Sequence, residues 1–322
     1  MPAAPTVPAE TTTVLRGIVL MLAAGFMFVL MDATAKHLAQ TYSVTQVAWA
    51  RYIFHMATLP VLFGRHRWTA VVRTPRLGLQ LARSVLLLAS TFLFFLAVKF
   101  IPLADATAIG FVGPLLVTAL SVPLLGEQVG WRRWAAVIVG FAGVLVIIRP
   151  GFGVLHWAVV LPLLVAVCFA LYQIGTRVLS RTDGWATTLF YSASVGVVAM
   201  SAAVPFQWRT PDLAGWVAMA FLGLMGSLGH LAMIRAFAAA PASTLAPFAY
   251  MQLVWAIVIG FALFGDFPDG ATLAGAAVIA ASGLYVIERE RRLRERAPAS
   301  GTAAPVNPPD AAPDRAAGTP TE

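Results

Sequence analysis

The sequence has few charged residues and one cysteine. Only 11% of its 322 residues are Asp, Glu, Lys or Arg, against about 25% in an average soluble domain. So few charges cannot cover the apolar surface of a chain that is 59% hydrophobic, so the composition excludes an ordinary soluble enzyme. The single Cys168 excludes a disulfide framework and a cysteine-based zinc site.

Motifs for metals, cofactors and nucleotides are also missing. The five histidines are scattered without an HExxH arrangement, and no GxxxxGK[ST] loop occurs. We therefore expect no metal, no cofactor and no direct use of ATP. The net charge is +8, and the arginines that produce it lie mostly between apolar runs. This placement indicates contact with anionic membrane lipids and argues against a nucleic-acid partner.

Long apolar runs predict an all-α membrane protein with ten transmembrane helices. A spanning helix needs about 20 apolar residues, whereas the strands of a β-barrel alternate over about 10 residues. Residues 1–12 and the end of the basic segment 290–322 are rich in Pro and Ala, so both are expected to be disordered tails. The predicted spans are 14–36, 45–63, 78–100, 103–125, 132–149, 156–178, 186–206, 213–238, 242–264 and 270–288.

The placement of basic residues predicts the orientation. If the N-terminus is cytoplasmic, 15 Lys and Arg residues fall on the inside and 4 on the outside. This bias favours a bacterial-type inner membrane protein with both termini in the cytoplasm. A cleaved signal peptide ending near Ala33-Thr34-Ala35 is the alternative for the first span, but the internal repeat includes that segment.

The two halves of the chain repeat one another. A shift of 141 residues superposes Lys36 on Arg177, and a shift of 139 superposes Pro102 on Pro241 and Glu127 on Asp266. Each half holds five predicted spans, so the second half enters the membrane with the opposite orientation. Inverted repeats of this kind are typical of secondary transporters, whose substrate site lies near the midplane between the halves.

Several short motifs in order point to a family. They are Lys36, Arg51 in AWAR, the run IPLADATAIGFVGPLL, LLGEQVG and the glycines Gly140 and Gly143, with a weaker echo in AAPASTLAPFAYMQLVWAIVIGFALFGD. With them the chain resembles the EamA-domain branch of the drug/metabolite transporter superfamily. The resemblance implies two inverted five-helix repeats, residues 13–150 and 155–289, around a central cavity with alternating access. The opening from Met31 to Lys36 is similar to branches that carry S-adenosylmethionine or riboflavin.

Ionisable residues inside the predicted spans are the strongest site candidates, because each costs about 2.5–3.5 kcal/mol at the bilayer centre. Asp32 can pair with Arg51 to fix helix packing, bind a cationic group or take up a proton. Arg51 can hold a carboxylate or phosphate through two parallel hydrogen bonds, or extend to the interface. His55 lies near it in depth, and His230 is either a proton acceptor and polar contact or a hydrogen-bonded structural residue.

Other polar residues are given weaker roles. Arg83 is expected to extend to the cytoplasmic interface, and Lys36 and Arg177 to anchor their helices at opposite faces of the membrane. Asp105, Asp266 and Asp269 are expected to be solvated. The neutral groups that could orient a substrate are Tyr172, Gln173, Tyr191, Tyr250 and Gln252.

Glycines and prolines predict where helices break or pack. Gly110, Gly113 and Pro114 fall at the middle of the fourth span, and Pro247 lies in the ninth. Proline removes a backbone hydrogen bond, so these positions can line a cavity, form a hinge or simply kink the helix. Small residues on other helices favour close helix contacts, including those of a homodimer.

These features predict a secondary transporter for a small polar or amphipathic organic metabolite, such as an amino-acid derivative or a vitamin-like compound. Coupling is to a proton, carried by Asp32 or His230, to an exchanged solute, or absent. A channel-like facilitator or a membrane sensor without transport is the alternative. A lipid enzyme is disfavoured, because no nucleophile, base or metal cluster gathers at one depth.

Overall fold

The computed structural model describes residues 9–64, 71–126, 130–149, 157–179, 182–240, 245 and 248–296, and these residues are all helical apart from connecting turns. Eight helical segments of the described residues are long and apolar enough to cross a membrane, with residues 103–124 counted as one segment. Eight is fewer than the ten predicted. The 20-residue α2, which carries Arg51 and His55, is not among the eight, and α12 has only 14 residues.

The helices follow the predicted spans closely, and the first half contains α1 to α7. Two ends differ from the predictions, because α1 begins inside the segment expected to be a tail and α13 continues through the basic residues. The fourth span is two helices, which separate at the glycines and proline where a break was predicted. In the first half, the helices are α1 (Ala9–Leu38), α2 (Val44–Phe63), α4 (Leu77–Phe100), α5 (Leu103–Gly110), α6 (Gly113–Leu125) and α7 (Trp131–Ile148). In the second half, they are η1 (Trp157–Val159), α8 (Val160–Leu179), α9 (Trp185–Ala203), η2 (Val204–Gln207), α10 (Leu213–Ala239), α12 (Met251–Phe264) and α13 (Gly270–Arg296).

Local sequence explains several helix ends. The Ser43 hydroxyl accepts a hydrogen bond from the Gln46 backbone N–H at the start of α2, at 3.2 Å. The Asp212 carboxylate accepts one from the Gly215 N–H at the start of α10, at 2.7 Å. These side chains bond backbone N–H groups that the first turn of a helix leaves without a partner.

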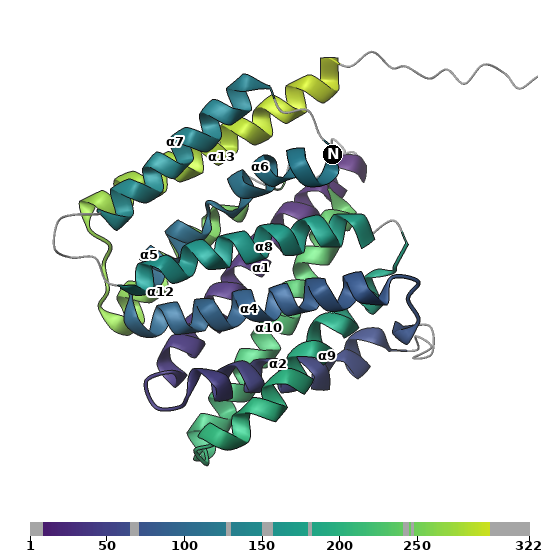
Figure 1. Ribbon diagram of the computed structural model, residues 1–322, viewed down its shortest axis with the longest axis vertical. Helices are drawn as coiled ribbons and strands as arrows, with labels where there is room; N and C mark the ends of the chain where they lie inside the picture. The colour runs from purple at the N-terminus through teal and green to yellow at the C-terminus, as the bar shows by residue number, and fades with distance from the viewer. Residues whose placement is uncertain are drawn as a thin grey trace, which may run out of the picture.

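Five helix pairings organise the bundle (Figure 1). Helix α1 packs on α10, α4 on α8, and α7 on α13, while α2 packs on both α9 and α10. The α7–α13 contact needs glycine, since a Cβ atom on Gly275 would lie 2.5 Å from the Gly143 carbonyl oxygen. The small residues of these two helices therefore pack against each other within the chain.

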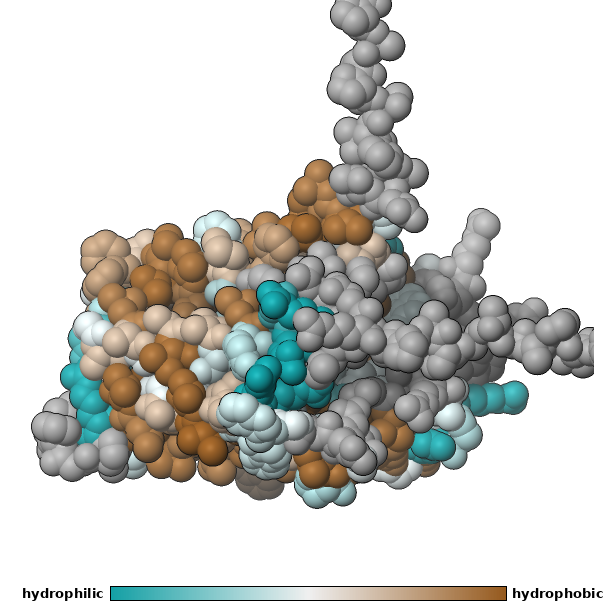
Figure 2. Space-filling model, turned by 90° about the horizontal axis from the view of Figure 1, so that it is seen from above, coloured by the Kyte–Doolittle hydropathy of each residue, from teal (hydrophilic) through white to brown (hydrophobic). Residues whose placement is uncertain are grey.

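The outer surface of the bundle is apolar, as expected for a protein in lipid. Figure 2 shows a brown hydrophobic band between teal hydrophilic groups at its two ends. Large apolar side chains such as Ile138 and Val198 are 66% and 71% exposed there. Tryptophans near helix ends, including Trp131 and Trp157, are also exposed, in agreement with an interfacial aromatic belt.

Candidate functional site

Arg51 of α2 lies at the meeting point of four helices. Its side chain is 3% exposed. The guanidinium donates to the Thr91 hydroxyl of α4 at 3.0 Å, and its Nε lies 3.4 Å from the sulfur of Met31 of α1. It also lies 4.8 Å from the centre of the Tyr52 ring, and the Tyr52 hydroxyl donates to the same Thr91 oxygen at 3.1 Å. Arg51 is therefore held in place by neutral groups alone and does not extend to the interface.

Two histidines complete the surroundings of Arg51. The Nε2 atom of His230 of α10 lies 3.5 Å from Arg51 Nη2, and the His55 and His230 rings are 5.9 Å apart. His55 is 2% exposed, and both of its ring nitrogens are buried without a hydrogen-bond partner. A buried nitrogen without a partner costs about 1–3 kcal/mol, so a polar ligand at this point would recover that energy.

Asp32 of α1 faces the same region without a direct ion pair. It is 6% exposed and adjoins Met31, which contacts Arg51. No oxygen of Asp32 lies within 4.0 Å of an Arg51 nitrogen. The predicted packing pair of Asp32 with Arg51 is thus not formed in this structure. We call Asp32, Arg51, His55 and His230 the central cluster.

Glycines of α10 allow the central cluster to form. A Cβ atom on Gly223 would lie 2.3 Å from Phe54 Cβ, and one on Gly226 would lie 3.0 Å from the Met31 sulfur. A Cβ atom on Gly229 would lie 2.8 Å from the Phe28 ring, which contacts His230 edge to face at 5.0 Å. The glycine face of α10 is therefore occupied by neighbouring residues of α1 and α2.

Arg83 of α4 differs most from its prediction. Its side chain is 1% exposed, and it donates to the Thr176 hydroxyl at 3.0 Å and to the Thr188 carbonyl at 2.8 Å. It also donates to the Ser192 hydroxyl. The prediction that Arg83 extends to the interface is wrong, because these acceptors on α8 and α9 hold it inside the bundle. Tyr172 lies under its guanidinium at 4.7 Å, with Gln173 half-buried on the same helix.

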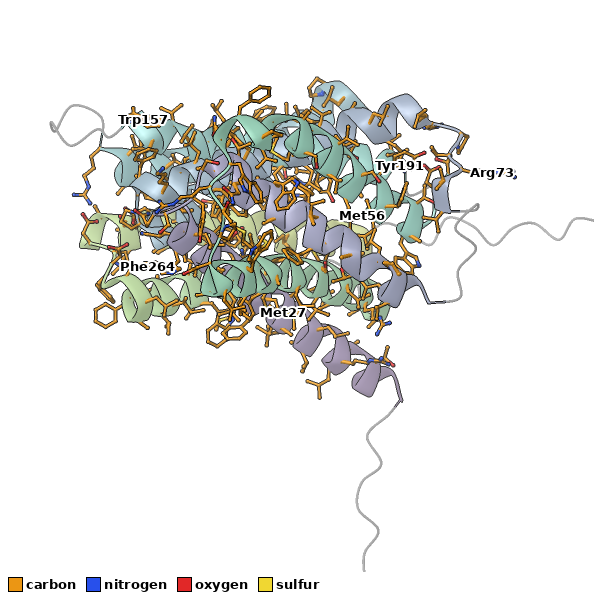
Figure 3. The ribbon with its side chains drawn as sticks, turned by 90° about the horizontal axis from the view of Figure 1, so that it is seen from below. Met27, Met56, Arg73, Trp157, Tyr191 and Phe264 are labelled. Atoms are coloured by element: carbon orange, nitrogen blue, oxygen red, sulfur yellow. The ribbon has the colours of Figure 1, made fainter. Side chains whose placement is uncertain are left out.

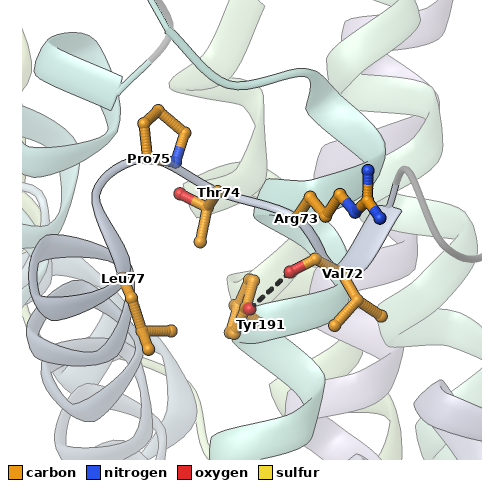
Figure 4. Close-up of a pocket in the computed structure, with 6 residues that line it drawn as sticks. All are labelled: Val72, Arg73, Thr74, Pro75, Leu77 and Tyr191. Atoms are coloured by element: carbon orange, nitrogen blue, oxygen red, sulfur yellow. Dashed lines mark hydrogen bonds between the residues drawn. The ribbon is translucent and has the colours of Figure 1, made fainter.

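Tyr191 does not join the central cluster. Its hydroxyl donates to the Val72 carbonyl at 2.7 Å, beside an open hollow of about 350 Å³ lined by residues 72–75, Leu77 and Tyr191 (Figure 4). Figure 3 shows Tyr191 and Arg73 at one end of the bundle, with Trp157 and Phe264 at the other. Tyr191, predicted as a group that could orient a substrate, therefore lies apart from the central cluster.

Tyr250 lies at the predicted break in the fourth span. Helix α5 ends at Gly110 and α6 begins at Gly113, with Pro114 in its first turn. The Tyr250 ring stacks on Phe111 in this break at 5.0 Å, and its hydroxyl is buried without a partner. The corresponding Pro247 lies outside the described residues. The hinge role of these residues remains a prediction.

Gln252 lies along α1 on the same side as Asp32. A Cβ atom on Gly25 would lie 3.5 Å from Gln252 Cβ. Gly25 and Asp32 are seven residues apart, which is about two helical turns and about 10 Å. Gln252 therefore packs on the face of α1 that leads towards the central cluster.

Two of the acids predicted to be solvated form ion pairs between the halves. Lys36 Nζ lies 2.5 Å from Asp266 Oδ2, and the Lys36 side chain is 11% exposed. Arg149 pairs with Asp269. A hydrogen bond from the Thr272 backbone N–H, together with Arg149, lowers the pKa of the exposed Asp269 carboxyl. Lys36 is therefore part of a buried contact between α1 and the α12–α13 connection, not an interfacial anchor.

Some contact residues were missed by the sequence reasoning. Thr91, Tyr52 and Met31 all touch Arg51. A threonine in an apolar helix and a tyrosine beside an arginine carry no motif. The position of Thr91 on the buried side of α4 is the one signal that could have found it.

Comparisons with known proteins agree with this architecture. The profile of the EamA-like transporter family matches residues 15–149 and 156–288. An S-adenosylmethionine uptake transporter of Rickettsia bellii is 30% identical over 81% of this chain and 89% of its own length. A riboflavin transporter of Vibrio cholerae is 27% identical over 88% and 96%, and a pseudopaline exporter of Pseudomonas aeruginosa is 26% identical over 82% and 93%.

A solved crystal structure shows the same fold. It is 17% identical, covers 87% of this chain and 99% of its own, and superposes with a TM-score of 0.59. The named relatives are transporters, which supports the expectation that this chain is no enzyme. With a family profile that matches both halves, the chain belongs to the EamA-like transporter family and is a multi-pass membrane protein.

Proposed function

We propose that the protein is a secondary transporter for a small organic metabolite with both an anionic and a cationic group, bound at the central cluster. One observation carries this proposal. Arg51 is buried among neutral partners, and no ion pair joins it to Asp32. A substrate carboxylate on Arg51 and a substrate cation near Asp32 would compensate both charges. Buried charges without partners cost several kcal/mol, on the order of 3–5.

We further propose ten crossings arranged as two inverted repeats. The sequence repeat equates α1 with α8, α2 with α9, α4 with α10, and α7 with α13. Under this exchange the α1–α10 contact becomes the α8–α4 contact, and both are present (Figure 1). The same exchange maps the α2–α9 contact and the α7–α13 contact each onto itself. This symmetry supports a pseudo-two-fold axis through the bundle, about which the halves would rock in alternating access.

Both termini are proposed to lie in the cytoplasm. Among the arginines counted on the inside, Arg132, Arg133 and Arg289 line one hollow where α7 begins and α13 nears its end. Their clustering at one end of the bundle supports the bias of basic residues towards the inside. We also propose that two copies of the protein form a homodimer.

Metabolite counterflow in proteoliposomes tests this function. Vesicles loaded with unlabelled S-adenosylmethionine, riboflavin or a bacterial metabolite extract are placed in trace labelled compound, and accumulation is read by mass spectrometry. We expect S-adenosylmethionine to exchange well above empty liposomes, because it carries a carboxylate and cationic groups. Riboflavin has neither a carboxylate nor a cationic group, so it serves as the comparison.

The same assay separates the alternatives. A carrier shows faster entry of label when unlabelled substrate is inside, whereas a channel-like facilitator shows the same rate with empty vesicles. A sensor without transport shows neither. If only leak without trans-stimulation is seen, alternating access is rejected for this protein.

Asp32 is proposed as the proton carrier if transport is coupled. Asp32 adjoins Met31, which contacts Arg51, and Arg51 in turn lies 3.5 Å from His230. We expect Asp32→Asn to flatten the dependence of uptake on external pH, since Asn cannot titrate. Uptake would be measured between about pH 4 and about pH 8.5, a window that includes the ordinary pKa values of aspartate (about 3.9) and histidine (about 6.5). His230→Gln is the matched variant for the second candidate, and an unchanged profile in Asp32→Asn excludes Asp32 from coupling.

A further inference from the structure

Arg83 is a second deeply buried cation that the proposed function does not use. Two of its nitrogens donate to neutral oxygens of Thr176, Thr188 and Ser192. Its third nitrogen, Nε, is buried without any hydrogen-bond acceptor. Guanidinium has five N–H donors in a fixed fork, so one edge of Arg83 still has a donor to offer.

Arg83 differs from three other cations of the described residues, each of which has a carboxylate partner. Lys36 pairs with Asp266 in a largely buried contact, and the more exposed Arg149 and Arg292 pair with Asp269 and Glu288. In the described residues, no carboxylate lies within 4.0 Å of Arg83, although it is 1% exposed. Isolated charges in a membrane interior are rare because they are costly, and they mark substrate pathways when they persist.

Polar groups connect Arg83 to the central cluster along α4 and α9. Arg83 and Thr91 both lie on α4, eight residues and about 12 Å apart. Between them, the Tyr52 hydroxyl contacts the Leu87 carbonyl at 3.4 Å and the Thr91 hydroxyl at 3.1 Å. On α9, Ser192 binds Arg83, and Gly196 one turn later packs against the Tyr52 ring.

The surroundings of Arg83 also suit a ligand with an aromatic or apolar part. Its guanidinium lies 4.7 Å from the Tyr172 ring centre, and Phe169 stacks on Tyr172 at 5.6 Å. Gly175 of α8 leaves room for the stem of Arg83, which lies 3.5 Å from a Cβ built there. These contacts fix the position of Arg83 while leaving its Nε edge unbonded.

We propose that Arg83 is a second binding position for the substrate carboxylate, nearer the end of the bundle where α4 begins. The carboxylate occupies this position after it leaves Arg51. This inference rests on the proposed function, because it assumes an anionic substrate that crosses the bundle. It makes Arg83 a specificity-determining residue that acts on one side of the membrane.

The test compares S-adenosylmethionine with decarboxylated S-adenosylmethionine, which lacks only the carboxylate. KM is measured in right-side-out and inside-out membrane vesicles for the wild type, Arg83→Gln, Arg83→Lys and Arg292→Gln. For Arg83→Gln we expect KM for S-adenosylmethionine to rise about tenfold from the cytoplasmic side, as for loss of one charged hydrogen bond. KM from the other side, and KM for the decarboxylated compound, should stay unchanged.

The variants distinguish a binding role from a structural one. Arg83→Lys should recover part of the affinity, and the exposed Arg292→Gln should match the wild type. Equal changes for both compounds, or no change for either, would overturn the proposal. If Arg83→Gln does not reach the membrane, the ratio of the two KM values in Arg83→Lys decides in the same way.

Failure of the proposed function would be seen separately. If the wild type exchanges none of the compounds, the transport proposal fails. Arg83 is then judged on the purified protein, by the melting temperature in methionine and in methioninamide. Stabilisation by methionine that is lost in Arg83→Gln supports a carboxylate site, and equal melting shifts in the two proteins reject it.

Discussion

Replacing Arg51 with Gln is expected to reduce exchange of a carboxylate-bearing substrate about 100-fold, which corresponds to about 2.7 kcal/mol. Gln keeps a donor for the Thr91 hydroxyl, which Arg51 now bonds at 3.0 Å, but it removes the charge. Arg51→Lys keeps the charge and loses the planar fork, so it should recover only part of the rate. Initial rates of counterflow at saturating and limiting substrate measure the effect.

Folding must be separated from transport in the Arg51 variants. Size-exclusion profiles and melting temperatures of the purified proteins show whether the bundle is intact. Arg149→Gln is the matched control, because Arg149 is partly exposed and paired with Asp269 at the end of α7, where a surface pair contributes at most about 1 kcal/mol. A folded Arg51→Gln protein with more than half of the wild-type rate would remove Arg51 from the site.

Gly196→Ala is expected to give the second large effect, on both stability and transport. A Cβ atom at this position would lie 2.3–2.5 Å from carbons of the Tyr52 ring, which is 1% exposed and cannot move outward. Overpacking of this kind costs about 1–3 kcal/mol. Since Tyr52 bonds Thr91 and its ring lies 4.8 Å from the Arg51 guanidinium, its displacement would also disturb the central cluster.

A control and a double variant test this explanation. Gly78→Ala lies in open space at the start of α4, so its melting temperature should equal or exceed that of the wild type. In a Tyr52→Leu background, which removes the ring carbons, Gly196→Ala should cost much less than alone. An undiminished loss in that background would show that the clash with Tyr52 is not the cause.

The helix bounds were predictable because the bilayer dictates them. The predicted spans 78–100 and 213–238 correspond to Leu77–Phe100 and Leu213–Ala239. Continuous apolar runs of about 20 residues leave little freedom in where a helix begins and ends. The break in the fourth span was also expected from Gly110, Gly113 and Pro114, and α5 and α6 are separate helices there.

The partners of the polar side chains could not be predicted in the same way. Lys36 and Asp266 are 230 residues apart in sequence, and no local pattern gives the distance between them. For Tyr191, the number of residues from the start of its span predicts the position of the backbone but not the direction of the side chain. Helical side chains lean towards the N-terminus of their helix, so its hydroxyl reaches the Val72 carbonyl at the end of the bundle.

The contact between α1 and α10 can form only late in synthesis. Helix α1 ends at Leu38, and α10 begins at Leu213, so the ribosome must add the intervening chain before the two can meet. At about 5–20 residues per second, that takes roughly 9 to 35 s. During this time Asp32 of the newly inserted α1 lies in a central cluster that is still incomplete, because α10 and its His230 have not been made. Nascent chains that stop before α10 should therefore be recognised by membrane quality control and degraded.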